Sequence, residues 1–208
     1  MHFYTCSIAP NPQRVAILLK LKGITLETTE VDILKGEHFA DDFKTLNPAC
    51  TLPVLSLEDG TVLTDTIAIC YYLDRKYPNK PLFGNDALET AQVIGLMHKL
   101  YTEGVMPIAE ILRNQGETFK DRAIPGRVNI PQISQLIPRG KLRLAAFWDD
   151  MNRALENKTF LVGEQLSQAD IDLFVICNFV NWVKEQVPSH CIEISRWYKN
   201  VQNIVENL

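Results

Sequence analysis

The stretch Thr51-Leu52-Pro53-Val54 decides how this sequence is read, because it sets a proline directly before an apolar, strand-like run. A proline cannot donate a hydrogen bond to a sheet, so its position at the start of a strand needs a physical reason. Under one interpretation, Pro53 opens an edge strand. Under the other, the Leu52–Pro53 bond is cis and lies in a tight turn, which leaves the N–H and C=O of Leu52 free to pair with a peptide ligand.

The residues on either side of this stretch predict an α/β unit with the order βαβ–α–ββ–α. Pro12 is placed to open a helix and Gly23 to end it, and the apolar residues between them recur with helical spacing. The turn Glu58-Asp59-Gly60 predicts a hairpin after Pro53. The predicted strands lie at residues 2–6, 26–34, 53–57 and 61–64, and the predicted helices lie at 13–22, 39–46 and 65–76.

The pattern changes after residue 77. Residues 78–86 are typical of a linker, and no strand-like run appears beyond Asp86. Helices are predicted at 88–113 and 133–156, then from Ser167, whose capping box uses Asp170, and at 193–206. The sequence therefore predicts a first domain at 1–77, a linker at 78–86 and an all-helical domain at 87–208.

Composition excludes several classes of protein. The net charge of −4 and the pI near 5.6 argue against a nucleic-acid partner, which would need a basic face. The most apolar run, residues 171–183, is shorter than the roughly 20 residues that span a bilayer. The first residues do not resemble a signal peptide. The five cysteines are scattered without a CxxC pair, and the four histidines form no cluster. We therefore expect reduced thiols, a cytoplasmic location, no membrane association and no metal site.

Two helix starts could bind a small ligand. Asp65-Thr66 follows a predicted strand and opens a helix, which is ordinarily only a cap. The same geometry could hold a ligand carboxylate on free amides and a ligand ammonium on the aspartate. The loop from Ala9 to Val15 precedes the first helix, and the N-terminus of that helix could stabilise a thiolate.

These loops, in this order, resemble those of the glutathione S-transferase superfamily, whose front domain has the thioredoxin fold. Leu52-Pro53-Val54-Leu55 is similar to its cis-proline signature, and residues 63–69 resemble its xESxAI element with Asp for Glu and Thr for Ser. Ser167-Gln168-Ala169-Asp170-Ile171 resembles the SxADI start of a core helix in the helical domain. The resemblance covers essentially the whole chain, and residues 9–11, 31–38 and 47–48 are most similar to nu-class bacterial and fungal members.

The resemblance implies an α/β thioredoxin-like domain followed by an all-α domain, a homodimer, and glutathione as co-substrate. Asp65 and Thr66 would hold the γ-glutamyl end of glutathione, and His38 would reach its glycyl carboxylate. Thr51, Leu52 and Pro53 would clamp the cysteinyl unit. The electrophile site would draw on Ile8, Pro10, Tyr101, Val105 and Met106, whose other interpretation is ordinary core packing.

One position departs from the family pattern. Ala9 stands where relatives carry the Ser or Cys that stabilises the glutathione thiolate. Asn11 is the expected catalytic substitute, with the backbone amides of residues 10–13 or a water as alternatives. Ser7 and Cys6 lie nearby but upstream. The long helix offers further donors, among which the sequence does not choose: Tyr101, Glu103, Glu110, Arg113 and Asn114.

Three functions follow from this sequence. The first is a glutathione transferase that attacks a small hydrophobic electrophile and could also reduce organic hydroperoxides. The second is a glutathione-binding regulatory protein without catalysis, for which Ala9 is the argument. The third, a dithiol reductase, would have to use Cys6, because Ala9 occupies the nucleophile position.

Overall fold

The computed structural model describes residues 1–207, and the chain divides into two compact units. The first unit holds residues 1–80 together with 124–129. The second holds residues 81–123 together with the chain from Ile130 onward. No helix within residues 1–207 is long and apolar enough to cross a membrane.

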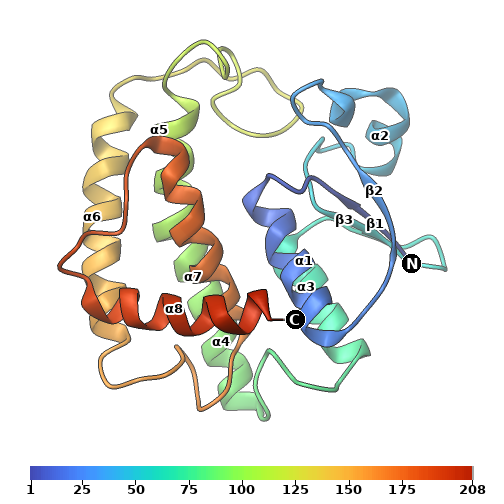
Figure 1. The fold of residues 1–208 in the computed structure, drawn as a ribbon. Coiled ribbons are helices and arrows are strands. Elements are labelled where there is room, and N and C mark those ends of the chain that lie inside the picture. Colours follow the sequence, from blue (N-terminus) through green and yellow to red (C-terminus); the bar gives the residue numbers. More distant parts are fainter. Residues whose placement is uncertain (208) are drawn as a thin grey trace. The chain divides into compact units, whose positions relative to one another are not determined.

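The first unit is built on a four-stranded sheet with the order β2-β1-β3-β4. Strands β1, β2 and β3 are labelled in Figure 1. Strand β1 (His2–Thr5) pairs in parallel with β2 (Glu27–Glu30) and antiparallel with β3 (Val54–Ser56). Strand β3 pairs antiparallel with β4 (Val62–Leu63). Strand β3 is therefore an interior strand, and the interpretation of Pro53 as the start of an edge strand is wrong.

Helices complete this unit. The helices, in chain order, are α1 (Pro10–Lys22), the 3-10 turn η1 (Glu37–Phe39), α2 (Asp41–Leu46) and α3 (Thr66–Lys76). Helix α1 packs against α3, and it ends at Gly23, whose left-handed backbone (φ 65°) suits glycine. Phe43 of α2 packs with Val31 and Val54.

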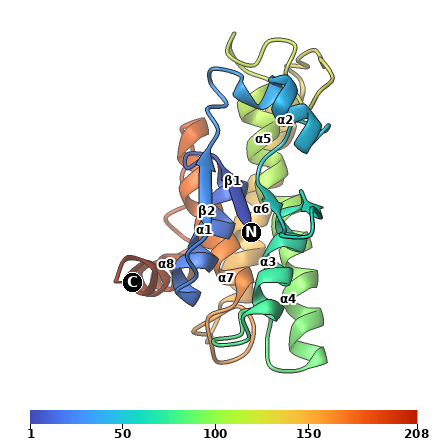
Figure 2. The same ribbon diagram turned by 90° about the vertical axis from the view of Figure 1, so that its right-hand side faces the viewer.

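The second unit is entirely helical. Its elements are α4 (Ala87–Leu100), the π-helical turn η2 (Tyr101–Val105), α5 (Met106–Arg113), α6 (Leu136–Ala154), α7 (Gln168–Phe179), the 3-10 turn η3 (Val180–Val183) and α8 (Ile192–Glu206). Every residue of α7 except Asn178 is buried, so α7 is the core helix. The predicted capping box of Ser167 and Asp170 is present at its start. Figure 2 shows α4 running on into α5.

The predicted fold class, a thioredoxin-like domain followed by an all-α domain, is confirmed. Two features differ from the prediction. The single helix expected at 88–113 is interrupted by the π-helical turn η2. Residues 124–129, which the prediction gave to the helical domain, belong to the first unit. Two backbone hydrogen bonds join the residues on either side of segment 124–129. Ala123 N–H donates to Ile130 O, and Ile130 N–H donates to Asp121 O.

Candidate functional site

Sheet topology brings three of the predicted site segments to one edge. Tyr4, near the end of β1, pairs with Val54 at the start of β3, and Leu63 at the end of β4 pairs with Leu55. The loop after β1, the turn before β3 and the start of α3 therefore leave the sheet on the same side. Strand β2 is parallel to β1, so the segment that carries His38 also starts from this edge.

The Leu52–Pro53 bond is cis, as the second interpretation of Pro53 predicted. Within residues 1–207, the N–H and C=O of Leu52 take part in no protein hydrogen bond. Pro53 is buried and Leu52 is half-buried. This turn therefore presents the unpaired backbone N–H and C=O of Leu52 close to the first residue of an interior strand.

Asn47 shapes the loop before this turn. Its side-chain amide donates to Thr51 O at 2.8 Å and to Thr51 Oγ1 at 3.2 Å, and its Oδ1 accepts from Ala49 N–H at 3.1 Å. Asn47 is only 2% exposed. From the sequence, Asn47 and Pro48 follow the end of the predicted helix 39–46. The structure adds that the Asn47 side chain holds the loop in front of the cis-proline turn. The only signal for this in the sequence was the short loop between the helix end and Pro53.

The start of α3 offers free donors beside a carboxylate. Asp65 is the N-cap, and its Oδ1 accepts from Ala68 N–H at 3.0 Å. Asp65 is exposed, so its second oxygen can face a ligand, whereas Thr66 is buried. Within the described chain, the N–H groups of Thr66 and Ile67 have no protein acceptor, as expected for the first turn of a helix.

Among residues 10–13 at the start of α1, Asn11 is the residue whose backbone N–H has no protein acceptor. Pro10 and Pro12 carry no N–H, and Gln13 N–H is used by Ala9 O. The side-chain Oδ1 of Asn11 accepts from Arg14 at 3.2 Å. In residues 1–207, neither the backbone N–H nor the side-chain NH₂ of Asn11 has a protein acceptor. Of the amides expected at residues 10–13, only that of Asn11 is available.

Ser7 and Cys6 are poorly suited to activate a thiol. The Ser7 hydroxyl donates to Glu30 Oε1 at 2.9 Å, and its backbone N–H donates to the same oxygen at 2.6 Å. Cys6 is buried, and its burial raises the pKa of its thiol, with the charge of Glu30 acting in the same direction. Cys6 is therefore a protonated thiol near neutral pH.

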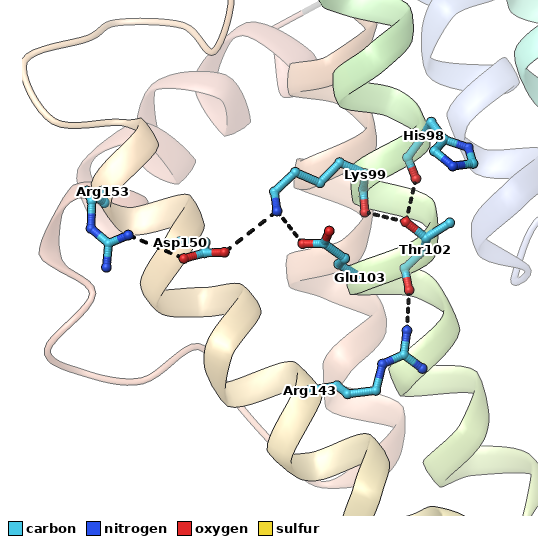
Figure 3. A network of polar contacts seen from close by, with 7 residues as sticks. All are labelled: His98, Lys99, Thr102, Glu103, Arg143, Asp150 and Arg153. Carbon is cyan, nitrogen blue, oxygen red and sulfur yellow. Dashed lines mark hydrogen bonds and ion pairs between the residues drawn. The ribbon is translucent and has the colours of Figure 1, made fainter.

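The second unit holds the five long-helix residues that were candidates to donate a hydrogen bond to the glutathione thiolate, and most of them already have partners. Glu103 pairs with Lys99, and Glu110 accepts from Arg139 and Arg143 (Figure 3 shows the first of these pairs). A carboxylate also has no proton to offer a thiolate. Arg113 donates to Arg122 O, and buried Asn114 donates to Glu110 O. Among the five long-helix candidates, the Tyr101 hydroxyl is the one without a hydrogen bond inside the described part of the chain.

The other predicted site residues differ in exposure. His38 is half-buried in η1, with its ring centroid 3.8 Å from that of Phe39. Ile8, Tyr101 and Met106 are exposed, Pro10 is half-buried, and Val105 is buried at 6% exposure. Tyr101, Val105 and Met106 lie in the second unit, at the π-helical turn and the residue after it.

Three side chains of the second unit that could hold a metal ion lie close together. His190 Nε2 is 2.9 Å from Asp149 Oδ1, and the ligand atoms of Asp149, His190 and Cys191 lie within 4.8 Å of one another. Sequence spacing did not predict this group because Asp149 is far from the other two residues along the chain.

Comparisons with known proteins agree with this architecture. The family model for the glutathione S-transferase N-terminal domain matches residues 8–76, and a model named for the nuclear-export cofactor Arc1p matches residues 130–205. Glutathione S-transferase 2 of Saccharomyces cerevisiae is 28% identical over 207 residues, which cover 97% of this chain and 85% of the yeast protein. Glutathione S-transferase D7 of Drosophila melanogaster is 26% identical, with 98% and 85% covered.

A solved structure shows the same likeness. The glutathione S-transferase domain-containing protein of Marinobacter aquaeolei VT8 aligns with a TM-score of 0.88 and 27% identity, over 97% of each chain. The nu-class likeness stays a prediction. The matches cover both units in chain order, and they support the glutathione S-transferase superfamily for this chain.

Proposed function

We propose that this protein is a glutathione transferase that binds glutathione at the sheet edge formed by the start of α1, the cis-proline turn and the start of α3. The observation that carries the proposal is the unpaired backbone N–H and C=O of Leu52, at the same edge as the free N–H groups of Thr66 and Ile67. A residue with free backbone N–H and C=O groups next to a free helix start is suited to an extended peptide with a terminal carboxylate.

Each part of glutathione has a matching group in this arrangement. The γ-glutamyl carboxylate would accept from the N–H groups of Thr66 and Ile67, and its ammonium would donate to the open oxygen of Asp65. The cysteinyl unit would pair with the backbone of Leu52. By resemblance to the family, His38 would contact the glycyl carboxylate.

Asn11 is proposed to take over the role of the missing Ser or Cys. A free thiol has a pKa of roughly 8.5, so a donor to the sulfur and a helix N-terminus must lower it for reaction near neutral pH. Asn11 offers two donor groups in the first turn of α1, its backbone N–H and its side-chain NH₂. The thiol proton passes to solvent, the thiolate forms an S–C bond with the electrophile, and any leaving group departs with the electron pair of its bond.

The electrophile is proposed to be small and hydrophobic, and in the first unit it would contact Ile8 and Pro10 beside the start of α1. Val105 of the second unit is buried, so it is not proposed to contact the electrophile. Reduction of organic hydroperoxides would need the same activated thiol. A cytoplasmic homodimer is proposed on family resemblance alone.

The alternative is a protein of the same fold that binds glutathione without catalysis. Ala9 favours it, because no hydroxyl or thiol stands at that position. The ultraviolet absorbance of the bound thiolate, followed against pH, separates the two. Under the transferase proposal, bound thiol ionises at lower pH than free glutathione. A bound thiol that stays protonated above about pH 8 would overturn the transferase proposal.

A further inference from the structure

Within the second unit, the last two turns of α6 hold the start of α8. Asn152 Oδ1 accepts hydrogen bonds from Glu193 N–H at 2.9 Å and from Ile194 N–H at 3.3 Å. Both donors belong to the first turn of α8, where a helix has no carbonyl groups of its own to accept them. The side chain of Asn152 therefore fixes the start of α8, with Cys191 as its N-cap residue, against α6.

Three side chains with different ligand atoms meet at this junction, and we call Asp149, His190 and Cys191 the α6–α8 cluster. His190 Nε2 lies 2.9 Å from Asp149 Oδ1, and Cys191 Sγ lies 3.8 Å from Trp148 O. One ligand atom from each member of the cluster lies within 4.8 Å of the other two. Asn152 holds the two helices together without using any of these three atoms, so the atoms stay available to a ligand.

The distances in the cluster suit one tetrahedral metal ion. Zinc binds nitrogen and oxygen at about 2.0–2.1 Å and sulfur at about 2.3 Å, so its tetrahedral ligand atoms lie roughly 3.3–3.6 Å apart. His190 Nε2 and Asp149 Oδ1, at 2.9 Å, need to separate by only a few tenths of an ångström. The 4.8 Å limit on the third atom requires an approach of no more than roughly 1.5 Å, which rotation of the exposed side chains provides.

The exposure of the three members matches a site that keeps one position open. Cys191 is 0% exposed, whereas the side chains of His190 and Asp149 are 67% and 56% exposed. A bound ion would therefore have protein on the side of the sulfur and solvent on the side of the other two ligands. Solvent supplies both an entry path and a water molecule as the fourth ligand.

The charge of Asp149 is not neutralised by a lysine or an arginine. Within residues 1–207, the ion-pair partner of Asp149 is His190 alone. The next residue, Asp150, by contrast lies 3.6 Å from Lys99 Nζ and 3.4 Å from Arg153 Nη1 (Figure 3). Of these two adjacent carboxylates, Asp150 already has cationic partners, and Asp149 is the one placed to attract a further cation.

We propose that the α6–α8 cluster binds one zinc ion, which links α6 to the start of α8. A thiolate, an imidazole and a carboxylate together suit zinc, whereas Mg²⁺ and Ca²⁺ take oxygen ligands. As the sulfur binds, its proton passes to solvent, and the thiolate and the carboxylate then balance the charge of the ion. Zinc binding here does not depend on the proposed transferase function. The expectation of no metal site rested on sequence spacing, which does not show that α6 reaches His190.

Titration of the reduced, chelator-treated protein with Co²⁺ tests the site. Co²⁺ is the probe because it can take the ligands of zinc and its complexes absorb light. We expect saturation at one ion per chain, with a thiolate-to-cobalt absorption band that disappears when excess Zn²⁺ displaces Co²⁺. The same excess of Mg²⁺ should leave the band unchanged. Cys191→Ser should abolish the band, because it removes the sulfur ligand.

Variants of the two exposed ligands decide the outcome even if Cys191→Ser fails to fold. Asp149→Asn and His190→Ala should each weaken Zn²⁺ binding at least about tenfold, the smallest effect expected even for a residue that only orients a ligand. The matched controls are Asp150→Asn, at the next residue of α6, and His98→Ala, which changes an exposed histidine of the same unit. Both controls should bind Zn²⁺ like the unmodified protein.

Thermal unfolding gives a second measurement. An ion that binds only the folded chain raises the midpoint of unfolding, so Zn²⁺ should raise it in the unmodified protein and in both controls. The increase should be smaller in Asp149→Asn and His190→Ala. The absence of one-to-one saturation would overturn the proposal. A thiolate-to-cobalt band that persists in Cys191→Ser, or equal Zn²⁺ affinity in Asp149→Asn and Asp150→Asn, would also overturn it.

Discussion

Lys22 Nζ lies 2.8 Å from Asp74 Oδ1, and both side chains are only 1% exposed. The same ammonium donates to the carbonyl groups of Tyr77, Asn79 and Lys80, at 2.8 to 2.9 Å. The end of α1 is thereby tied to α3 and to the segment that follows it. A buried charge of this kind is tolerated because a carboxylate and backbone carbonyl groups accept the hydrogen bonds that water would otherwise accept.

Replacing Lys22 by Met should strongly destabilise the first unit. The change leaves Asp74 buried without its cation, for which the expected loss in free energy of unfolding is about 3–5 kcal/mol. Urea denaturation measures this loss. The control is Lys44→Met, whose pair with Asp41 is exposed and should be worth less than about 1 kcal/mol. Equal losses in the two variants would contradict the structural role given to Lys22.

Asn47→Ala should loosen the loop before the cis-proline turn. The variant removes the two donations to Thr51 and the acceptor for Ala49 N–H, so a loss of about 1–3 kcal/mol in unfolding free energy is expected. Glutathione affinity should fall as well, because Leu52 follows this loop directly. Calorimetry of glutathione binding checks the second effect. Undiminished affinity in a folded variant would show that Asn47 does not support the site.

Cys6 should resist alkylation near neutral pH. Burial raises the pKa of its thiol, so the thiolate fraction at a given pH is smaller than that of an ordinary cysteine. Iodoacetamide labelling followed by mass spectrometry should show Cys6 unmodified at neutral pH, with labelling rising only as the pH passes above the usual thiol range. The denatured chain is the control for full labelling. Rapid labelling of the folded protein at neutral pH would revive the dithiol reductase hypothesis.

Asn11→Ala should raise the pKa of the glutathione thiol bound to the protein, because the side-chain donor is lost. The backbone N–H of Asn11 stays, so the expected rise is about one unit, the size of a single hydrogen bond. Ala9→Ser should shift the same pKa down by adding a hydroxyl donor. The ultraviolet absorbance of the thiolate against pH measures both shifts. An unchanged pKa in Asn11→Ala would remove Asn11 from the catalytic role.

Most of the fold could be predicted because its boundaries are marked by local chemistry. Pro12 and Gly23 bracket α1, Asp65 caps α3, and Ser167 with Asp170 caps α7. The cis bond before Pro53 was one of two interpretations that the local sequence left open, and only the position of β3 between β1 and β4 decides between them.

The parts that escaped prediction depend on partners far apart in the sequence. Helical periodicity continues through Pro107, so residues 88–113 read as one helix, although the proline itself was the available signal for the π-helical turn. That Arg143 would occupy the Thr102 carbonyl depends on how α6 packs, which no local pattern encodes. That Gln13 N–H is not available at the start of α1 follows only from its hydrogen bond to Ala9 O, which the sequence does not show.

Calorimetric titration of glutathione into the unmodified protein, Asp65→Asn and Asp59→Asn tests the central claim most directly. Asn keeps the cap on Ala68 N–H but removes the charge that would hold the ligand ammonium. Asp59 accepts Thr61 N–H in a comparable way and lies in the turn between β3 and β4, so it is the matched control. We predict saturable binding to the unmodified protein, at least about tenfold weaker binding to Asp65→Asn, and no change in Asp59→Asn. The absence of saturable binding to the unmodified protein, or equal affinity in all three, would contradict the glutathione site described above.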